Sequence, residues 1–528
     1  MADSYAILRA SPLAPGGAAE VGNKAWNLMR MAQAGLPVPP AFVLPTDWSA
    51  RHAPADAVAL NAALEGGIAA LEAASGLGFG ATWRPLLVSV RSGAAVSMPG
   101  MMETVLDVGL NAATVEGLIA LTGNPRLAWD SYRRLVQGFS EVVAGQPTAP
   151  FDALVAAALV AAEVEQEAEL DFRSLRGLTR AMLVCYRDLV GSAFPDDPRK
   201  QLRAATDAVF RSWNAPKAKS YRRLNGLDGA AGTAVTVQTM VYGNAGGTSG
   251  AGVGFTRNPA TGERQFYFDF RFDAQGEDVV AGRQAMRDND RLRQDLPDIW
   301  QRLDAMCREL EALFRDAQDF EFTVQDGALF LLQARRAKRT DWAALAIAVD
   351  LVEEGLLTPA EGLHLLDGIE LEGVARTSFA PPVPATLAVA QVASLGVASG
   401  IIALDSNAVK RLTAAGESAI FVRHDTVTSD IEGMAMAAGI LTATGGRTSH
   451  AAVVARQLGK VCLVGCPTLV IDLALRTCRI GQTTLREGEA ISLDGNSGAV
   501  FPGTLAALAE RPEHMLATIA GWRGEATA

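Results

Sequence analysis

Cysteine is scarce in this sequence, with five cysteines among 528 residues. Their positions, Cys185, Cys307, Cys462, Cys466 and Cys478, form neither a disulfide ladder nor a paired CxxC metal site. Cys462 and Cys466 flank a predicted strand, which is typical of buried core thiols. A disulfide framework is therefore excluded, and a reducing compartment, the cytoplasm, is expected.

Long apolar runs and basic stretches are also lacking. The most apolar stretch, ALVAAALVAAEV at 153–164, is shorter than the roughly 20 residues that cross a bilayer, so it predicts a buried helix. The first 17 residues have no basic head followed by an apolar core, so no signal peptide is predicted. The formal net charge of −11 and the absence of a long Lys/Arg stripe argue against binding to nucleic acid.

The sequence does contain enough material for several ordinary domains. At roughly 100–200 residues per domain, its length predicts about three. Hydrophobic residues make up 49% and charged residues 20%, which is typical of globular proteins. Periodicity and turn signals predict a multidomain α/β and α+β protein. The predicted parts are a mainly helical segment at about 112–225, a hairpin at 319–335, helices at 341–372, a Pro-rich linker at 378–386, a compact α/β domain at 387–503 and a final helix at 504–522.

The stretch TATGGRTSHAAVVARQLGK, residues 442–460, contains one of only five histidines. Gly445-Gly446 permits a tight turn, and Thr448 and Ser449 are capping residue types, so a helix is predicted to begin near His450. A helix N-terminus favours anions such as a phosphoryl group, and imidazole is a competent nucleophile near neutral pH. The pattern fits a phosphate-carrying histidine, and it fits a capping-region histidine without chemistry equally well. No Cys or carboxylate stands at ligand spacing nearby, which argues against a metal site.

Six other residues have the chemistry that an ATP site requires, namely cations for the phosphates and oxygen ligands for Mg²⁺. They are Lys24, Arg91, Asp319, Glu321, Gln333 and Arg335. The last four alternate along the two strands of the predicted hairpin, so each pair shares a face of its strand. Taken singly, each residue is typical of an ordinary surface charge or polar group. Only the set as a whole indicates a metal and phosphate surface.

The sequence motif around His450 is long and specific. GGRTSHAAVVARQLGKVCLVGC, with FVRHDTVTSDIEGM upstream and GEAISLDGNSGAV downstream, closely resembles the swivelling phosphohistidine domain of the pyruvate, phosphate dikinase family. The resemblance implies that His450 becomes phosphorylated, with Thr448 and Ser449 beside it as part of the catalytic segment. Thr448 matches the threonine at which plant members are regulated by phosphorylation, and the sequence leaves open whether that regulation exists here.

Seven further segments resemble the ATP-grasp nucleotide domain of the same family, in the same order. They are EVGNKAWNLMRMAQAGLPVPPAF, LLVSVRSGAAVSMPGMMETVLDVGLN, WDSYRRLVQGFSEVVAG, GTAVTVQTMVYGNAGG, GVGFTRNPATGE, DAQGEDVVAG and DFEFTVQDGALFLLQARRAKRT. The resemblance covers essentially residues 10–503. It implies an ATP-grasp domain at 1–340 with a helical insertion at about 112–225, a helical linker or hinge at 341–386, a swivelling phosphohistidine domain at 387–503, and a C-terminal helix and tail at 504–528.

The resemblance also implies roles in a site that binds ATP with Mg²⁺. Lys24, Arg91 and Arg335 would contact phosphates. Glu321 and Gln333 would hold Mg²⁺, with support from Asp319. The adenine hinge would be formed by Gln238, Met240 and Val241, and Glu277 would meet the ribose. A loop that closes over the γ-phosphate would contain Gly100, Met101 and Thr104. Two departures from the family pattern, NAGGTSGAG at 244–252 and Asp273 where Asn is expected, leave the nucleotide affinity open.

The resemblance therefore implies an ATP-dependent phosphotransferase with ATP and phosphate as substrates. His450 would attack the β-phosphorus and release AMP, and phosphate would then remove the terminal phosphoryl group as pyrophosphate. The family's TIM barrel needs roughly 250 residues and cannot fit into 504–528, so the final acceptor is expected in trans. A separate phosphoenolpyruvate/pyruvate-binding barrel is the favoured partner. The sequence leaves open the identity of the acceptor, whether phosphate or water takes the second phosphoryl group, and whether the protein is an oligomer.

Three other interpretations stay open. The first is a small-molecule kinase similar to rifampin phosphotransferase, although 341–386 is too short for the substrate domain that this family inserts there. The second is a non-catalytic nucleotide-binding regulatory module. The third is that the sequence is a piece of a longer enzyme.

Overall fold

The computed structural model describes residues 4–8, 11–51, 57–96, 98, 102–224, 227, 232–264, 267–276, 288–427, 430–446 and 449–527. The chain divides into two compact units, one formed by 1–249 with 323–335 and the other by 250–322 with 336–528. This division passes through two β-strands, at residues 322/323 and 335/336, so it does not test the predicted domain boundaries. Those boundaries stay a prediction.

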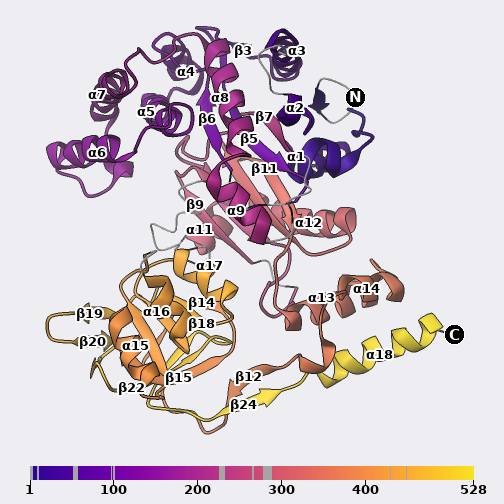
Figure 1. Ribbon diagram of the computed structural model, residues 1–528, viewed down its shortest axis with the longest axis vertical. Helices are drawn as coiled ribbons and strands as arrows, with labels where there is room; N and C mark the ends of the chain where they lie inside the picture. The colour runs from indigo at the N-terminus through magenta and orange to yellow at the C-terminus, as the bar shows by residue number, and fades with distance from the viewer. Residues whose placement is uncertain are drawn as a thin grey trace. The chain divides into compact units, whose positions relative to one another are not determined.

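The first unit is built on an antiparallel sheet with the strand order β1-β2-β7-β5-β6. Its strands β5, β6 and β7 are labelled in Figure 1. Its strands are β1 (Tyr5–Ile7), β2 (Ala41–Leu44), β5 (Val88–Ala94), β6 (Thr104–Val108) and β7 (Thr233–Thr239), and β3 (Gly78–Phe79) pairs separately with β4 (Pro85–Leu86). All of β2 and almost all of β7 are buried, which suits the apolar and β-branched residues of AFVL and TAVTVQT. The middle of this sheet is therefore core on both faces.

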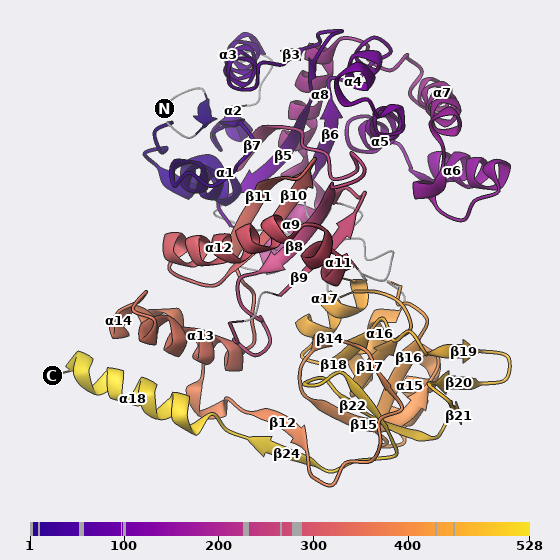
Figure 2. The same ribbon diagram turned by 180° about the vertical axis from the view of Figure 1, so that it is seen from behind.

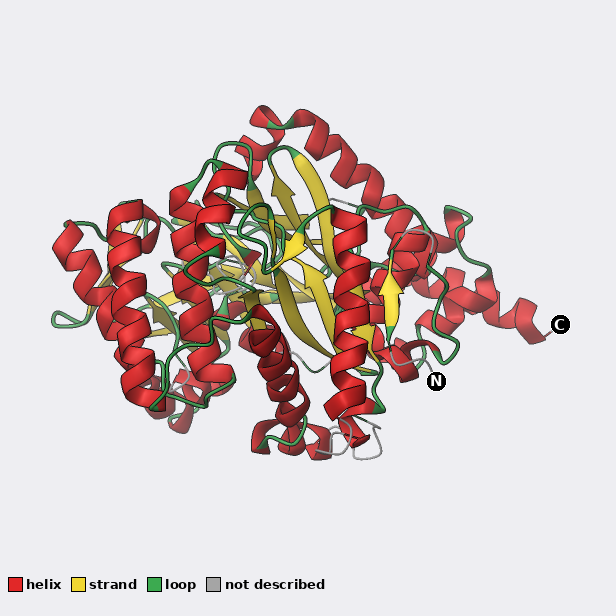
Figure 3. Ribbon diagram, turned by 90° about the horizontal axis from the view of Figure 1, so that it is seen from above, coloured by secondary structure: helices red, strands yellow, loops and turns green. Residues whose placement is uncertain are grey.

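Helices surround these strands, as the view from above shows (Figure 3). They are α1 (Gly17–Gln33), α2 (Trp48–Arg51), α3 (Ala57–Ser75), α4 (Thr114–Thr122), α5 (Pro125–Val142), α6 (Ala149–Ala162), α7 (Phe172–Val190), α8 (Pro198–Ser212) and α9 (Pro216–Leu224). The helical segment predicted at about 112–225 is confirmed as helical by α4 to α9. Asn124 caps α5 by accepting from the N–H of Leu127, and Pro125 occupies the first turn, where its missing N–H costs nothing.

Helix α3 is long and apolar enough to cross a membrane by length and composition alone. One side of it, however, packs into the core of the first unit through Leu60, Leu64, Ile68 and Leu71. A Cβ on Gly67 of this helix would lie 2.5 Å from the Phe42 ring, which shows how closely α3 approaches β2. This side of α3 therefore belongs to the core of the first unit.

A buried ion cluster supports α5 from inside the helical segment. The Asp130 carboxylate accepts from Nε of Arg133 at 2.8 Å and from Nε of Arg134 at 3.0 Å, and Arg133 also reaches Glu167 at 2.6 Å. Burial by itself would raise the pKa of Asp130, but the charges of Arg133, Arg134 and Arg126 hold it below its usual value. Asp130 therefore remains ionised in the interior.

Replacing Asp130 with asparagine is expected to lower the free energy of unfolding by about 1–3 kcal/mol at neutral pH, since hydrogen bonds to a charged group are lost. The pKa of Asp130 is depressed in the folded state, so its contribution is complete above the unfolded pKa of about 4 and disappears as the pH falls through the folded pKa. Urea unfolding at pH 7 and at acidic pH values measures the difference. Asp188→Asn, which alters an exposed pair with Arg187, is the control and is expected to change stability little. A difference that stays constant with pH contradicts the prediction.

A second sheet has the strand order β11-β10-β8-β9. Its strands are β8 (Gly250–Phe255), β9 (Tyr267–Phe272), β10 (Gln318–Gln325) and β11 (Ala328–Arg336), followed in Figure 2 beside α11 (Asp288–Asp295) and α12 (Pro297–Phe314). The predicted hairpin is confirmed, since Asp326 and Gly327 adopt positive φ between β10 and β11. Phe320 and Phe322 pack over Gly252 and Gly254 of β8, where a Cβ would come within 2.8 Å of a ring.

The segment between this sheet and the next domain begins with α13 (Asp341–Glu353) and α14 (Pro359–Leu365). Ile519 and Trp522 of α18 (Glu513–Thr527) pack against Leu345 and Val349 of α13. One prediction is corrected here, because residues 504–522 are not a single helix. Residues Ala507–Glu510 instead form strand β24, which pairs antiparallel with β12 (Arg376–Phe379), and the helix begins only at Glu513.

The predicted compact α/β domain is an eight-stranded sheet with the order β13-β23-β22-β15-β16-β17-β18-β14. Its strands are β13 (Ala388–Val389), β14 (Gln391–Ser394), β15 (Val397–Ala403), β16 (Ala419–Arg423), β17 (Gly439–Thr442), β18 (Val461–Val464), β22 (Ala490–Asp494) and β23 (Ala499–Pro502). Strands β15 to β18 are parallel, and helices α15 (Ser406–Ala414), α16 (Ile431–Met436) and α17 (His450–Gln457) connect them. A smaller sheet of β19 (Val470–Asp472), β20 (Thr477–Ile480) and β21 (Thr483–Arg486) completes the domain.

Candidate functional site

The position of Lys24 depends on a break inside helix α1. Gly22 has φ 75° and ψ 153°, which is not helical, so the helix kinks two residues before Lys24. A Cβ on Gly22 would lie 2.1 Å from the carbonyl oxygen of Gly93 on β5. A Cβ on Gly93 would in turn lie 3.7 Å from Cβ of Lys24. The kink therefore lets α1 touch β5 and places Lys24 over that strand.

Arg91 lies on β5, two residues before Gly93, and the sheet places another predicted residue beside it. The register pairs Arg91 with Thr104 of β6 on one side and with Thr236 of β7 on the other. Directly paired residues have Cβ atoms about 4.5–5.5 Å apart. Lys24, Arg91 and Thr104 thus come from three separate elements to one place. Gly100 and Met101, the other residues of the predicted phosphate loop, lie outside the described residues.

The predicted adenine hinge lies where the chain leaves β7. Gln238 is buried and its Nε2 donates to the carbonyl of Pro39 at 3.4 Å, so its side chain is directed into the protein. The N–H of Met240 donates to the carbonyl of Leu87 at 2.9 Å. Among the hydrogen bonds of the described residues, none uses the N–H of Val241. Val241 is therefore the member of this segment whose N–H is available to a ligand.

The hairpin of β10 and β11 carries the four residues of the predicted ATP site that were expected on it. Asp319 and Glu321 are partly exposed and alternate with the buried Phe320 and Phe322 along β10, so they share a face of that strand. Gln333 and Arg335 are likewise two residues apart on β11. The end of β11 is fixed to α1, because Nδ2 of Asn27 donates to the carbonyl of Ala334 at 2.9 Å.

Oxygen ligands from carboxylates and amides are those that Mg²⁺ prefers, so Glu321 and Gln333 fit this ion chemically. Within the described ranges, no group of three or more His, Cys, Asp and Glu side chains is arranged to hold a metal ion. This is compatible with Mg²⁺, which commonly binds through one or two protein ligands together with substrate phosphates and water. Glu277, the predicted ribose ligand, lies outside the described residues.

The helix predicted near His450 begins at that residue. Ser449 is the N-cap of α17, and its side chain accepts from the N–H of Ala452 at 3.4 Å. The turn before it uses Gly445 at φ 97°, and the N–H of Ser449 donates to the carbonyl of Gly446 at 3.0 Å. The capping role of Ser449 is therefore confirmed. Thr448 lies outside the described residues, as does the side chain of His450, so the placement of His450 is that of its backbone at the helix N-terminus.

The core on the far side of α17 fixes this helix against the sheet. Ala451, Ala452 and Ala455 pack with the buried Cys462 of β18. Burial raises the pKa of Cys462 to about 12, and burial likewise raises the pKa of Cys466, so both thiols are unreactive core residues as predicted.

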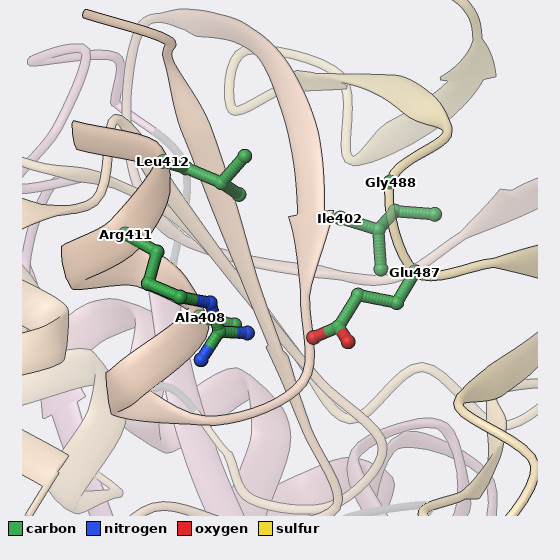
Figure 4. Close-up of a pocket in the computed structure, with 6 residues that line it drawn as sticks. All are labelled: Ile402, Ala408, Arg411, Leu412, Glu487 and Gly488. Atoms are coloured by element: carbon green, nitrogen blue, oxygen red, sulfur yellow. The ribbon is translucent and has the colours of Figure 1, made fainter. Parts of the chain in front are cut away.

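A small cavity in the same domain contains none of the predicted site residues. It has a volume of about 190 Å³ and is lined by Ile402, Ala408, Arg411, Leu412, Glu487 and Gly488. Arg411 and Glu487 point towards each other across it (Figure 4). Glu487 is already bound by Nε of Arg476 at 2.6 Å and by the N–H of Leu404 at 3.0 Å. The cavity therefore carries no argument for a ligand.

Sequence reasoning missed the residues that bring the site together. Gly93 and Asn27 bind no substrate in the prediction, yet they determine how α1 meets β5 and β11. The one local signal was Gly22 itself, since a glycine inside a helical pattern often marks a close backbone approach or a break. Nothing local to Gly93 or Asn27 distinguishes them from ordinary strand and helix residues.

Two protein-family models match parts of this chain. The model of the pyruvate phosphate dikinase AMP/ATP-binding domain matches residues 56–300, and that of the mobile domain of PEP-utilising enzymes matches residues 415–498. Pyruvate, phosphate dikinase of Clostridium symbiosum is 42% identical to this chain over 495 residues, or 92% of the chain. This chain belongs to the pyruvate, phosphate dikinase family. The family resemblance read from the sequence is thereby confirmed.

Plant members of the family are similar to this chain to about the same degree. Pyruvate, phosphate dikinase 2 of Zea mays is 42% identical over 489 residues, and the chloroplastic pyruvate, phosphate dikinase 1 of Arabidopsis thaliana is 40% identical over 508 residues. The chain spans about half the length of these family members. The matched part is 56% of the Clostridium protein, 55% of the maize protein and 53% of the Arabidopsis protein.

Proposed function

We propose that this chain is the ATP-using part of a dikinase-type phosphotransferase, which forms AMP and phospho-His450. The observation that supports this most directly is the helix start at His450. A Ser449-capped helix N-terminus follows a Gly-Gly turn, inside the part of the chain that matches the mobile domain of PEP-utilising enzymes. A helix N-terminus stabilises the negative charge of a phosphoryl group.

In this proposal, a ring nitrogen of His450 attacks the β-phosphorus of ATP. The bond between the β-phosphorus and the bridging oxygen of the α-phosphate breaks, and AMP leaves with that oxygen. Inorganic phosphate then attacks the terminal phosphorus of the pyrophosphoryl-histidine. Pyrophosphate departs, and one phosphoryl group remains on His450.

The chain's own residues would bind and orient the nucleotide. Lys24, Arg91 and Arg335 neutralise phosphate oxygens, and the arginines offer two parallel N–H donors each. Thr104 lies beside Arg91 and would contact the same phosphates as part of the closing loop with Gly100 and Met101. Val241 offers its N–H to adenine, with Gln238 and Met240 shaping the hinge and Glu277 at the ribose.

Mg²⁺ would lie at Glu321 and Gln333, with Asp319 supporting them. The ion supplies charge neutralisation for the phosphates when it is bound. Glu321 and Asp319 share one face of β10, which suits joint binding of one cation.

We also propose that the final phosphoryl acceptor binds outside residues 1–528. The relatives are named for pyruvate, and this chain matches about half of their length. The acceptor site that we favour is a pyruvate-binding part on a separate polypeptide. Movement of the domain at 387–503 about the linker at 341–386 would carry the phosphoryl group to it.

The decisive experiment is intact-mass measurement after incubation with MgATP, with and without phosphate, together with quantitation of AMP. The wild-type chain is expected to gain one phosphoryl group only when phosphate is present, and added pyruvate alone is expected to leave that group in place. His450→Ala is expected to lower the yield of adduct and AMP by roughly a thousandfold or more, since the nucleophile is removed.

His364→Ala is the matched control, because His364 is an exposed helix residue paired with Asp367 and far from the proposed chemistry in sequence. It is expected to behave as the wild-type chain. Equal phosphorylation of the His450→Ala variant and the wild-type chain contradicts the proposal.

A further inference from the structure

Strand β9 contacts the domain predicted at 387–503 through one of its two faces. Both parts belong to the second compact unit. The hydroxyl of Tyr267 on β9 donates to the carbonyl of Val392 on β14 at 3.2 Å. Two residues further along β9, Oδ2 of Asp269 lies 3.9 Å from the position that a Cβ on Gly446 would take. Two side chains on one face of β9 therefore reach two separate segments of that domain.

Both of these segments adjoin helix α17. Gly446 lies in the turn before the helix, and this turn is closed by the N–H of Ser449, which donates to the carbonyl of Gly446 at 3.0 Å. The backbone of His450 follows directly and begins the helix. On β14, the carbonyl of Ala393 accepts from Nη1 of Arg456, a residue of α17, at 3.0 Å. The carboxylate from β9 therefore lies beside the start of the helix that carries His450.

The sheet face that bears Asp269 also bears the predicted metal ligand Glu321. Phe270 of β9 is paired with Gly252 of β8, over which Phe322 of β10 packs, and the two rings stack with their centroids 5.8 Å apart. Successive side chains of a strand alternate between its two faces. Asp269 and Glu321 therefore lie on the face opposite to these rings. The turn before α17 meets the same face from which Mg²⁺ would be bound in the proposed function.

The chemistry of a buried carboxylate suits control of an imidazole. Asp269 is buried, which is rare for an aspartate that has no charged or hydrogen-bonding partner. A carboxylate that accepts from one ring N–H of a histidine fixes the tautomer and the orientation of the ring, so the other nitrogen keeps its lone pair for attack. The carboxylate also stabilises the positive charge that the ring acquires when that nitrogen bonds to phosphorus.

We propose that Asp269 is a positioning residue for His450, which accepts a hydrogen bond from one ring nitrogen while the other attacks the β-phosphorus of ATP. The inference rests on the proposed function, since it assumes that His450 is the nucleophile. The bond from nitrogen to phosphorus forms as the bond to AMP breaks. The proton on the bonded ring nitrogen stays there, and the carboxylate stays ionised. Asp269 contacts neither ATP nor Mg²⁺ in this proposal.

Single-turnover formation of AMP at saturating MgATP tests this role, measured over the pH range in which imidazole titrates. Asp269→Asn is expected to lower the rate constant by about a hundredfold or more, the effect of an incorrectly oriented imidazole. The Kd for MgATP, measured by calorimetric titration, is expected to stay within about threefold of the wild-type value, since Asp269 does not contact the nucleotide.

The pH profile separates positioning from a merely structural role. The rate is expected to rise with pH as the imidazole of His450 becomes neutral. A neighbouring carboxylate raises the pKa of an imidazole, so the acidic limb of the profile is expected to move to lower pH in Asp269→Asn. Arg271 and Glu321, charged groups on the same sheet face, are present in both proteins, so the movement reports the loss of the Asp269 charge. Asp269→Glu keeps the charge and is expected to retain the wild-type limb.

Asp316→Asn is the matched control, because Asp316 is another buried carboxylate of the same unit and is ion-paired with Nε of Arg336 at 2.7 Å. This variant is expected to lose stability, to keep the rate constant within about threefold of the wild-type value and to leave the acidic limb in place. Equal effects of Asp316→Asn and Asp269→Asn on the limb overturn the inference.

Three further results overturn the inference. The first is a rate constant for Asp269→Asn within about threefold of the wild-type value. The second is a lower rate constant with an unmoved acidic limb, since mere loss of the contact between β9 and the turn would slow the reaction in that way. The third is a Kd that rises about tenfold with an unchanged rate constant at saturation, since Asp269 would then serve the nucleotide. If Asp269→Asn does not fold, Asp269→Ser is measured in its place, and the same results decide.

Failure of the proposed function gives a different result. A wild-type chain that forms neither AMP nor phospho-His450 overturns both the proposed function and this inference. A wild-type chain that forms both, with an unaltered Asp269→Asn variant, overturns the inference alone.

Discussion

The Gly22→Ala variant is expected to lose ATP binding and to be destabilised by about 3 kcal/mol or more. The φ of Gly22 is 75°, and a left-handed backbone conformation costs an L-residue roughly 1–2 kcal/mol. The larger effect is steric, since the new Cβ would lie 2.1 Å from the carbonyl oxygen of Gly93, a backbone atom that cannot rotate away. Helix α1 must then shift from β5, and Lys24 moves with it. Calorimetric titration with MgATP and urea unfolding measure the two effects.

Gly66→Ala is the matched control for this prediction. Gly66 is also a helical glycine of the first unit, and a Cβ there would meet nothing within 4 Å. Alanine is expected to stabilise α3 by about 0.5–1 kcal/mol and to leave ATP binding unchanged. Tight ATP binding by Gly22→Ala contradicts the role given to the kink.

The Arg257→Ala variant is expected to lower the free energy of unfolding by about 3–5 kcal/mol, the range for removing one partner of a buried ion pair. Arg257 is fully buried after β8. Its guanidinium donates to Glu311 of α12 at 3.0 Å, to Asp350 of α13 at 3.1 Å and to Glu354 at 2.9 Å. Removing it leaves three carboxylates close together without their shared cation. Chemical unfolding monitored by far-UV circular dichroism measures the loss.

Arg264→Ala is the control for Arg257. Arg264 approaches the same Glu354 at 3.4 Å, but half of its side chain is exposed, so its loss is expected to cost less than about 1 kcal/mol. Similar losses in the two variants contradict the prediction. Arg257 also bears on the proposed swivelling, since it ties α13, at the start of the predicted linker, to α12 and to the loop after β8.

Local features of the site were readable in the sequence. The hairpin at 319–335 follows from alternating apolar residues around Gln-Asp-Gly, and the helix start at Ser449–His450 follows from capping chemistry. The burial of Cys462 and Cys466 follows from their place around an apolar strand. Each of these features depends on residues that are near one another in the chain, so a single sequence contains the signal.

The strand at Ala507–Glu510 shows where local signals fail. Its residues, ALAE, favour a helix, and the sequence predicted one from 504. The structure pairs them with Arg376–Phe379 instead, including an ion pair of Arg376 with Glu510 at 2.8 Å. Hydrogen bonds offered by a strand over 120 residues earlier outweigh an intrinsic preference of a few tenths of a kcal/mol per residue.

The sequence by itself determined the residue types, the order of the segments and the local elements that bear Lys24, Arg91 and His450. The tertiary structure alone decided that Gly22 touches Gly93, that Arg91 pairs with Thr104, and that an irregular register in β6 accompanies a fully buried Asp107. These contacts depend on strand register and on close backbone approach between distant segments. Neither leaves a periodic or capping signal in one sequence, because the partner that decides it lies tens to hundreds of residues away.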